Sequence, residues 1–568
     1  MYVLGISAYL ADSSAALVKD GVLVGAIEEE KLVRKKHTGE FPRRAIEFLL
    51  TEEGVTFEDI DHVAFFFKPL PALWHRIPLI LRHLPGSLDF LGSHGSEWMQ
   101  MLRIQSFLRR TFNAERAKFK FHNVSHHVCH AASSFFLSPF DSSAVITVDG
   151  AGEWENTAFW HAQGTRITRL HRECFPNSLG YLYAAVTQHL GFRPNSGEGK
   201  VMGLSSYGDP RTYEAEFEKI LSYNDNGRYH IDLTYFDYHR NAASIRNSKR
   251  WVSRKFIDRF GAMREPESQI EKRHEDIAAA LQSAFNKVFV HMVNALHRMT
   301  GESNLCMAGG VILNSVANGY AFRRSPFRDV FIQPAAGDGG TSVGAALAVY
   351  YRYNALRRES PSPYIFTGPE FQKAEMAAAI EKKGLAYREV PAASTAARLV
   401  AEGKIVGWFQ GKLEFGPRAL GNRSILADPR QADMKDIINA RVKFREPFRP
   451  FAPTILEERL GDYFDYAYPT PVMLLVYDVL PDKRAVIPAV THVDGSGRVQ
   501  TVSKKENPLY YDLIREFEKI TGVPVVLNTS FNVRGDPIVC TPEDALECFL
   551  NSGMDHLIMA DYLVSKNG

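Results

Sequence analysis

This chain of 568 residues has few cysteines, a small net charge and few long apolar runs. The five cysteines are scattered and odd in number, and no CxxC pair occurs. This pattern argues against a disulfide framework or a zinc ribbon and favours a reducing cytosol. Lys and Arg number 67 against 65 Asp and Glu, so the formal net charge is only +2. Such a balance disfavours bulk nucleic-acid binding, and we expect a small partner instead.

Segments that would enter a membrane are also missing. The first residues, MYVLGISAYLADSS, have no basic stretch followed by an apolar one, so we expect no signal peptide. The apolar region from Lys68 to Phe112 is broken by Arg76, Arg82 and several Pro and Gly residues. These breaks come well before the ~20 apolar residues that a membrane span needs. We therefore expect a cytoplasmic protein without membrane association, in which this region is a helical insertion.

The composition that remains is that of an ordinary globular protein, with 45% hydrophobic and 23% charged residues. A chain of this length is expected to form more than one domain, each with its own hydrophobic core, since domains usually span about 100 to 200 residues. A short strand pattern occurs twice, about 140 residues apart, as strand, strand, tight turn, strand. The predicted strands are Tyr2–Ser7, Ala15–Lys19 and Val22–Glu28, then Ser143–Asp149, Asn156–His161 and Arg166–Glu173. The repeat predicts two related α/β halves, residues 1–142 and 143–357.

A boundary follows the second half. The stretch from Glu359 to Pro363, ESPSP, can neither continue a helix nor join a central strand. We place a linker at residues 358–365 and a second α/β domain at residues 366–568. Its predicted elements include a helix at Ala374–Lys383 and the strands VGWF, MLLVYDV and VPVVLN.

The second domain carries a basic block between Gly407 and Arg449, with nine Lys or Arg residues and five carboxylates. Arg grips two phosphate oxygens with its planar fork, and Arg418 and Arg423 each follow a turn that contains glycine. Glycine lets backbone turn sharply or approach a ligand closely. The block predicts a site for a small phosphorylated substrate, while a solvated basic face remains the alternative.

A metal site is suggested in the first domain. His126 and His130 are four residues apart in a predicted helix, so both could reach one ion, and Asp338 lies at a predicted strand end. His127 is a rival ligand. The glutamate of an HExxH motif is absent. Two ordinary helix histidines therefore remain an alternative, and Cys129 is expected to serve packing.

Long segments of the chain identify a family. They are NSLGYLYAAVTQHLGFRPNSGEGKVMGLSSYG, MAGGVILNSVANG, GWFQGKLEFGPRALGNRSILADP, VKFREPFRPFAP and VVLNTSFNVRGDPIV. Together, and in this order, they closely resemble the O-carbamoyltransferase family that modifies antibiotics, nodulation factors and related natural products. The resemblance covers essentially the whole chain. It implies a duplicated actin-like (RNase H-like) domain followed by a YrdC-like α/β domain.

The resemblance also implies an activity. The C-terminal domain would form carbamoyl-AMP from carbamoyl phosphate and ATP, with Mg²⁺ accompanying ATP. The N-terminal domain would transfer the carbamoyl group to a hydroxyl of a small-molecule acceptor at a divalent metal, with iron the expected ion. The products would be the carbamate ester, AMP, pyrophosphate and phosphate. No nucleic-acid or membrane partner is implied, and a homodimer remains open.

Site residues follow from the same motifs. The implied metal ligands are His126, His130 and Asp338. The implied adenylate-binding residues are Glu198, Lys200, Gly203, Gly309, Gly310 and Asn314. The implied residues for carbamoyl phosphate and ATP are Arg418, Lys443, Arg449, Arg498, Ser530 and Asn532. Arg423, Arg445 and Arg534 could instead be structural ion pairs, and Glu198 could be an N-cap carboxylate.

One position departs from the family pattern. Many members carry a histidine before the Asp-Ser-Ala run, where this chain has Ala11. The nearest replacements are Asp12, Lys36 and His37, of which we favour Lys36 as a ligand-binding cation. With the metal site, these considerations give a predicted catalytic set of Asp12, Lys36, His130 and Asp338.

Competing functions share parts of this pattern. An actin-like ATPase or sugar kinase would leave the basic second domain unexplained. A tRNA threonylcarbamoyl transferase fits poorly with the modest net charge, and a binding-only scaffold fits poorly with the histidine and aspartate set. The acceptor is not revealed, because its pocket would come from variable stretches such as Lys68–Thr111 and Tyr223–Arg250.

Overall fold

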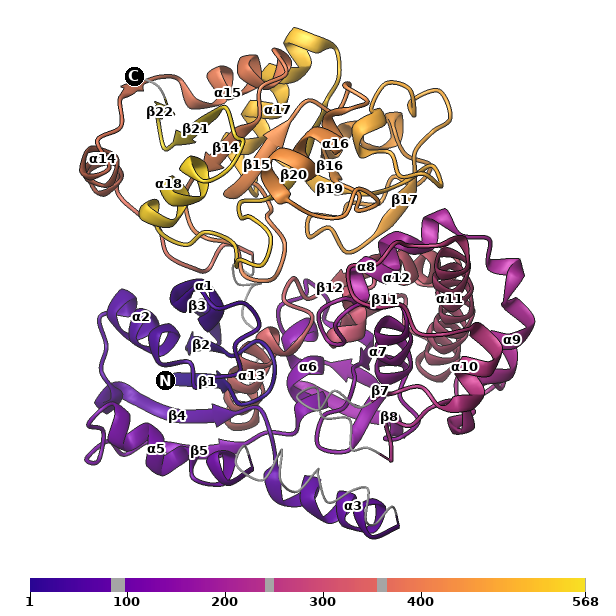
Figure 1. Cartoon of the computed structure of the whole chain (residues 1–568). Helices are drawn as coiled ribbons and strands as arrows, with labels where there is room; N and C mark the ends of the chain where they lie inside the picture. The colour runs from indigo at the N-terminus through magenta and orange to yellow at the C-terminus, as the bar shows by residue number, and fades with distance from the viewer. Residues whose placement is uncertain (83–97, 241–249, 355–364, 567–568) are drawn as a thin grey trace. The chain divides into compact units, whose positions relative to one another are not determined.

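The computed structural model describes residues 1–82, 98–240, 250–354 and 365–566 (Figure 1). The contacts divide the chain into two compact units. The first contains residues 1–29 and 37–363, and the second contains residues 30–36 and 364–568. The predicted linker at residues 358–365 lies outside the described residues except for its last position.

The first unit begins with a five-stranded sheet in the order β3-β2-β1-β4-β5. Strands β1 to β3 form an antiparallel meander, and β4 and β5 continue the sheet parallel to β1. The bounds are β1 Tyr2–Ser7, β2 Ser14–Lys19, β3 Val22–Glu28, β4 Ile60–Phe65 and β5 Lys120–Asn123. β1 and β2 are almost continuously buried, as expected for apolar strands covered on both faces.

The second half repeats this topology, in the order β12-β11-β6-β7-β8. Again three strands form an antiparallel meander and two add in parallel beside the first. The bounds are β6 Ser142–Val148, β7 Glu155–Gln163, β8 Arg166–Cys174, β11 Asn304–Ala308 and β12 Asp329–Ile332. The six strands predicted from the repeat are confirmed with small differences at their ends. The first unit is therefore a duplicated, actin-like α/β domain.

Helices connect and cover these sheets. Helix α13 packs against β1, β2 and helix α6 (Figure 1). The helices are α2 Arg43–Glu53, α3 Pro69–Arg82, α5 Ile104–Thr111, α6 His126–Phe135, α7 Leu179–His189, α8 Glu198–Leu204, α9 Glu214–Ile220, α10 Arg254–Phe260, α11 Lys272–Thr300, α12 Ser315–Phe322 and α13 Thr341–Tyr353. A two-stranded ribbon of β9 (Leu221–Tyr223) and β10 (Tyr229–Ile231) completes the unit. The predicted insertion contains α3 and α5, and the part between them at residues 83–97 lies outside the described residues.

The second unit is built on an eight-stranded mixed sheet in the order β13-β22-β21-β14-β15-β20-β16-β19. Its strands are β13 Tyr387–Glu389, β14 Val406–Phe409, β15 Arg423–Ala427, β16 Ala452–Leu456, β19 Gln500–Val502, β20 Val525–Ser530, β21 His556–Met559 and β22 Tyr562–Ser565. A small ribbon pairs β17 (Val476–Asp478) with β18 (Ser496–Arg498). The helices are α14 Lys373–Lys382, α15 Ala392–Ala401, α16 Met434–Ile438, α17 Pro508–Thr521 and α18 Pro542–Leu550.

Several predicted elements of this unit are confirmed, including α14 and the strands at VGWF and VPVVLN, whereas MLLVYDV contributes only the short β17. The sequence did not predict that a short N-terminal segment belongs to the second unit. Residues 30–36, which include most of helix α1 (Glu29–Val33), group with the second unit although they lie in the N-terminal part of the sequence. Across the described residues, no helix is both long and apolar enough to cross a bilayer.

Candidate metal site and anion site

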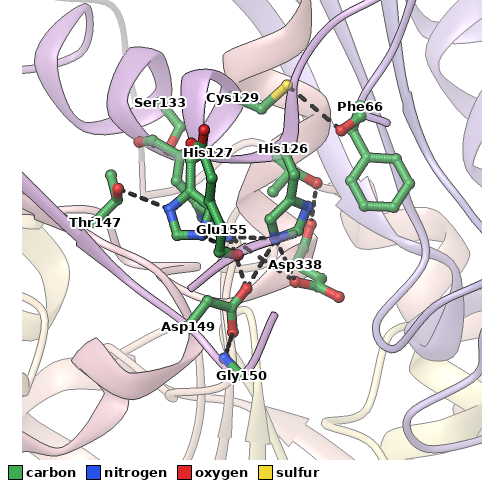
Figure 2. Close-up of polar contacts among 12 residues, drawn as sticks. Phe66, His126, His127, Cys129, Ser133, Thr147, Asp149, Gly150, Glu155 and Asp338 are labelled. Carbon is green, nitrogen blue, oxygen red and sulfur yellow. Dashed lines mark hydrogen bonds and ion pairs between the residues drawn. The ribbon is translucent and has the colours of Figure 1, made fainter. Parts of the chain in front are cut away.

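Four side chains of the first unit lie close together, and Figure 2 labels three of them, His126, Asp149 and Asp338. One ligand atom from each of His126, His130, Asp149 and Asp338 lies within 4.8 Å of the other three. Nε2 of His126 and Nε2 of His130 lie 2.8 and 3.2 Å from Oδ2 of Asp149, and 3.0 Å from each other. Oδ1 of Asp338 lies 3.6 Å from Nε2 of His126. We call these four residues the metal cluster.

The fold explains this convergence. His126 and His130 are one helical turn apart on α6, and the carboxylate of Glu153 accepts the backbone N–H of His126 where that helix begins. Asp149 follows β6 directly, and Asp338 follows β12 in a 3-10 turn. Because β6 and β12 are both parallel to β11, their carboxyl ends meet at the same edge of the sheet.

The electrostatics of the metal cluster favour a cation at its centre. Burial, and then the charge of Asp149, raise the pKa of Asp338 to about 8. Burial lowers the pKa of His126, but the hydrogen bond that His126 donates to Asp149 and the charge of Asp338 outweigh it and raise the pKa to about 9. Nε2 of His126, Nε2 of His130 and Oδ2 of Asp149 all lie within 3.2 Å of one another. A single proton among these three atoms cannot give each of them a hydrogen bond. Two imidazoles and two carboxylates are a donor set that suits a divalent transition metal.

His127, the rival ligand, points elsewhere. Its Nδ1 lies 2.9 Å from Oγ1 of Thr147 and its Nε2 lies 3.0 Å from the carbonyl oxygen of Glu155 (Figure 2). Burial, and then the charges of the two neighbouring histidines, lower the pKa of His127 to about 3. His127 therefore remains neutral and holds α6 against β6 and β7. Cys129 is fully buried, as expected for a packing residue.

Asp149 was missed by the sequence interpretation, although a signal existed. It is the last residue of SAVITVD, a predicted strand, and strand ends collect ligands in such folds. Gly310 packs directly against it, since a Cβ at that position would lie 2.9 Å from Oδ1 of Asp149. At Gly309, φ is 110° and a Cβ would meet the carbonyl oxygen of Val148 at 2.1 Å. Of these two predicted adenylate-binding glycines, Gly310 lies against the metal cluster, and Gly309 lies against the strand end just before it, where the backbone requires glycine.

The other predicted adenylate-binding residues have framework contacts. Oε1 of Glu198 accepts the backbone N–H of Asn195 at 2.7 Å in the first turn of α8, and burial raises the pKa of this carboxyl. Lys200 lies over the Phe192 ring, 5.4 Å from its centre, and Gly203 is on the same helix. Asn314 caps α12 through the N–H of Ala317. Their role toward a nucleotide stays a prediction.

Asp12 and His37 form a close pair in the first unit, with 2.8 Å between Oδ1 and Nδ1. Both residues have left-handed backbone, each with φ of 53°. Ser14, two residues beyond Asp12, donates its hydroxyl to the carbonyl oxygen of Gly339 at 2.6 Å, so this loop packs beside the turn that carries Asp338. Lys36 groups with the second unit, so the predicted catalytic set is divided between the units.

The second unit contains a cation cluster, which we define as Arg418, Lys443, Arg449 and Arg498. The guanidinium groups of Arg418 and Arg498 form no hydrogen bond or ion pair with any described residue, and their Nε atoms are buried. Burial, and then the charge of Arg449, lower the pKa of Arg418 to about 10. Burial and the charge of Arg418 lower the pKa of Arg498 well below its usual range. These cations are close enough to repel one another, and a bound polyanion would relieve that repulsion.

Lys443 is fixed by the other predicted ligands. Its Nζ donates to the carbonyl oxygen and Oδ1 of Asn532 at 3.0 and 2.9 Å, and also to the carbonyl oxygen of Ser530. Arg449 forms a long ion pair with Glu446, in which 3.8 Å separates Nη1 of the arginine from Oε2 of the glutamate. The structure thus brings all six predicted carbamoyl phosphate and ATP residues into one unit and connects three of them by hydrogen bonds.

Arg423 and Arg445 differ from the cation cluster. Arg423 is fully buried, donates to the carbonyl oxygens of Gln410, Asn422 and Pro369, and stacks 3.7 Å from the Phe409 ring centre. Arg445 donates from Nε to Oδ1 of Asn439 at 2.7 Å. Both arginines therefore hold the framework, through neutral oxygens rather than ion pairs.

Comparison with known proteins gives a consistent result. The family model described as Carbamoyltransferase N-terminus matches residues 2–347, and the model described as Carbamoyltransferase C-terminus matches residues 397–566. An uncharacterised protein of Synechocystis, sll1178, is 41% identical over 100% of this chain and 97% of its own length. Nodulation protein NolNO of Sinorhizobium fredii is 37% identical over 98% of this chain and 79% of its own length. Nodulation protein U of the same organism is 30% identical, over 92% of each chain.

Proposed function

The chain belongs to the carbamoyltransferase family, and we propose that it is an ATP-dependent O-carbamoyltransferase that works in two steps. The observation that carries this proposal is the presence of two chemically different sites, one in each unit. The metal cluster offers nitrogen and carboxylate donors, whereas the cation cluster offers the guanidinium groups of Arg418 and Arg498, which have no partner among the described residues. One site suits a divalent ion and the other suits phosphates.

In the first step, the second unit forms carbamoyl-AMP. Carbamoyl phosphate is hydrolysed to carbamate and phosphate, and the carbamate oxygen then attacks the α-phosphorus of ATP as pyrophosphate leaves. Carbamoyl phosphate, ATP and one water are consumed, so the atoms balance. Arg418, Arg449 and Arg498 bind the phosphate oxygens and stabilise the charge that develops on them, while Ser530 and Asn532 orient Lys443. ATP enters as its magnesium complex.

In the second step, the first unit transfers the carbamoyl group to an acceptor hydroxyl, and AMP leaves. The residues of the metal cluster would hold a divalent ion, for which we propose iron. Such an ion, when bound, supplies positive charge that polarises the carbamoyl adenylate. Oδ1 of Asp12 accepts from Nδ1 of His37, and we propose that the imidazole oriented by this contact takes the proton of the acceptor hydroxyl. The acceptor is a small hydroxylated molecule.

The first step provides the test. The purified full chain should release pyrophosphate and AMP from ATP only when carbamoyl phosphate is present, with one phosphate formed for each pyrophosphate. Release of ADP with a sugar acceptor would instead support a kinase. Pyrophosphate release that requires threonine and bicarbonate would support a tRNA-modifying enzyme, and either result would overturn the proposal.

A further inference from the structure

A lysine from the N-terminal part of the sequence is buried in the second unit. Lys31 belongs to helix α1 and only 1% of its surface is exposed. Its Nζ donates to the carbonyl oxygen of Glu414 at 2.6 Å and to that of Gly416 at 3.0 Å. Burial of an ammonium group is unfavourable unless hydrogen bonds replace its water. The two carbonyls that replace it both lie at the start of the loop that carries Arg418.

This loop, residues 414–423, is fixed by buried side chains along its length. Oε1 of Glu414 accepts the backbone N–H groups of Leu420, Asn422 and Arg423 at 2.8, 2.8 and 3.0 Å. The loop carbonyls are bound as well: Gln500 donates to Leu420, Asn528 to Ala419 and Trp408 to Gly421. The backbone around Arg418 is therefore held in place, although the guanidinium itself has no partner among the described residues.

Arg34 makes corresponding contacts with a second loop of the same unit. Its Nη1 and Nη2 donate to the carbonyl oxygens of Ile538 and Pro537 at 2.6 and 3.0 Å. Its Nε lies 3.5 Å from Oδ1 of Asp544, whose other oxygen accepts the N–H groups of Cys540 and Thr541. These residues end loop 530–541, which begins with the Ser530 and Asn532 that bind Lys443.

We infer that residues 30–36 are a built-in part of the phosphate site of the second unit, in which Lys31 and Arg34 act as positioning residues. Lys31 holds loop 414–423, which carries Arg418, and Arg34 holds loop 530–541, which carries Ser530 and Asn532. Lys36, at the end of the same segment, lies close enough to Lys443 to lower its pKa. This inference rests on the proposed function, because it assigns the cation cluster to phosphate binding.

The test uses full-length Lys31→Met and Arg34→Met variants, with Lys382→Met as the matched control. Lys382 is an exposed lysine of α14 in the same unit, so its loss changes the charge equally without touching either loop. Amide hydrogen exchange should increase in residues 414–423 for Lys31→Met and in residues 537–544 for Arg34→Met, while strand β14 keeps its protection. The affinity for inorganic pyrophosphate, measured by calorimetry, should fall at least tenfold in both variants and less than twofold in Lys382→Met.

Activity separates positioning from general damage. In both variants, kcat/KM for pyrophosphate formation should fall at least tenfold, whereas transfer from supplied carbamoyl-AMP should stay within twofold of wild type. Unchanged exchange in both loops together with wild-type pyrophosphate affinity would overturn the inference. If Lys31→Met does not fold, the same two measurements on Arg34→Met decide it alone. Failure of the wild-type chain to release pyrophosphate refutes the proposed function instead, and exchange and pyrophosphate affinity still decide the role of the segment.

Discussion

Replacement of Arg418 by methionine should stabilise the free protein and weaken its binding of phosphates. Burial and the charge of Arg449 lower the pKa of Arg418 to about 10, so its charged form is disfavoured in the folded state. This unfavourable contribution is present at every pH below that pKa, because the group is then charged in both folded and unfolded chains. At about 1.4 kcal/mol for each pKa unit, it amounts to roughly 3 kcal/mol before solvent screening. With the side chain half-buried, we expect a gain of about 1 kcal/mol in unfolding free energy.

The binding loss has a separate magnitude. A hydrogen bond to a charged group contributes about 1.5 to 3 kcal/mol, so the loss of this guanidinium should reduce pyrophosphate affinity by roughly ten- to a hundredfold. Calorimetry with and without pyrophosphate measures both effects in one set of scans, since the transition that pyrophosphate shifts is that of the second unit. Arg418→Met should raise the melting temperature of this transition without ligand and shrink its shift with ligand.

Arg423→Met is the matched control, five residues further along the same loop. Its guanidinium donates to three carbonyl oxygens, of which those of Asn422 and Pro369 also accept a backbone N–H, so substitution removes the charged donor chiefly from the buried carbonyl oxygen of Gln410. A buried polar group left without its hydrogen bond costs about 1 to 3 kcal/mol, so this variant should melt below wild type. If Arg418→Met melts as low as Arg423→Met and still binds pyrophosphate normally, Arg418 is a framework residue and the reasoning fails.

Three further predictions concern the first unit. His130→Ala should lose its divalent ion and its transfer activity but keep carbamoyl-phosphate-dependent pyrophosphate release; full metal occupancy by elemental analysis would remove it as a ligand. Asp149→Asn should lose metal to a similar extent, whereas a metal content equal to wild type would leave the ion to the other three side chains. Substitution of His37 by Asn should slow transfer by about 10²- to 10⁴-fold with metal content unchanged, and wild-type transfer rates in this variant would exclude the Asp12–His37 pair as the base.

The fold was largely accessible from the sequence, because its evidence is local. The strands of each half are apolar and separated by turn residues such as Asp20-Gly21, and the same order of strands recurs. The helix pattern also placed His126 and His130 on one face. Asp149 was not predicted as a ligand because its partners are distant in sequence. Only the rule that ligands collect at the carboxyl ends of parallel strands could have linked it to Asp338.

The roles of individual arginines and lysines were less accessible. Arg418 and Arg423 occupy similar glycine-containing turns, yet Arg423 donates to carbonyl oxygens, whereas the guanidinium of Arg418 has no partner among the described residues. The difference arises from the path of the loop, which depends on Glu414 and Gln500. Lys31 lies in EEEKLVRKK, a charge-rich stretch that is typical of a solvated helix. Its burial is a tertiary effect, and no local pattern in this stretch predicts it.

The backbone around Asp12 gives an independent reason to assign it a function. Tyr9, Asp12 and His37 all have positive φ, and left-handed backbone at residues other than glycine costs of order 1 kcal/mol or more each. The conformation persists because the two segments bind each other, through Tyr9 N–H to the carbonyl oxygen of Gly39 and Ser13 N–H to that of Thr38. What the strained conformation does achieve is the contact between Asp12 and His37, beside the turn that carries Asp338. The chain therefore presents an imidazole oriented by a carboxylate beside the turn that carries Asp338.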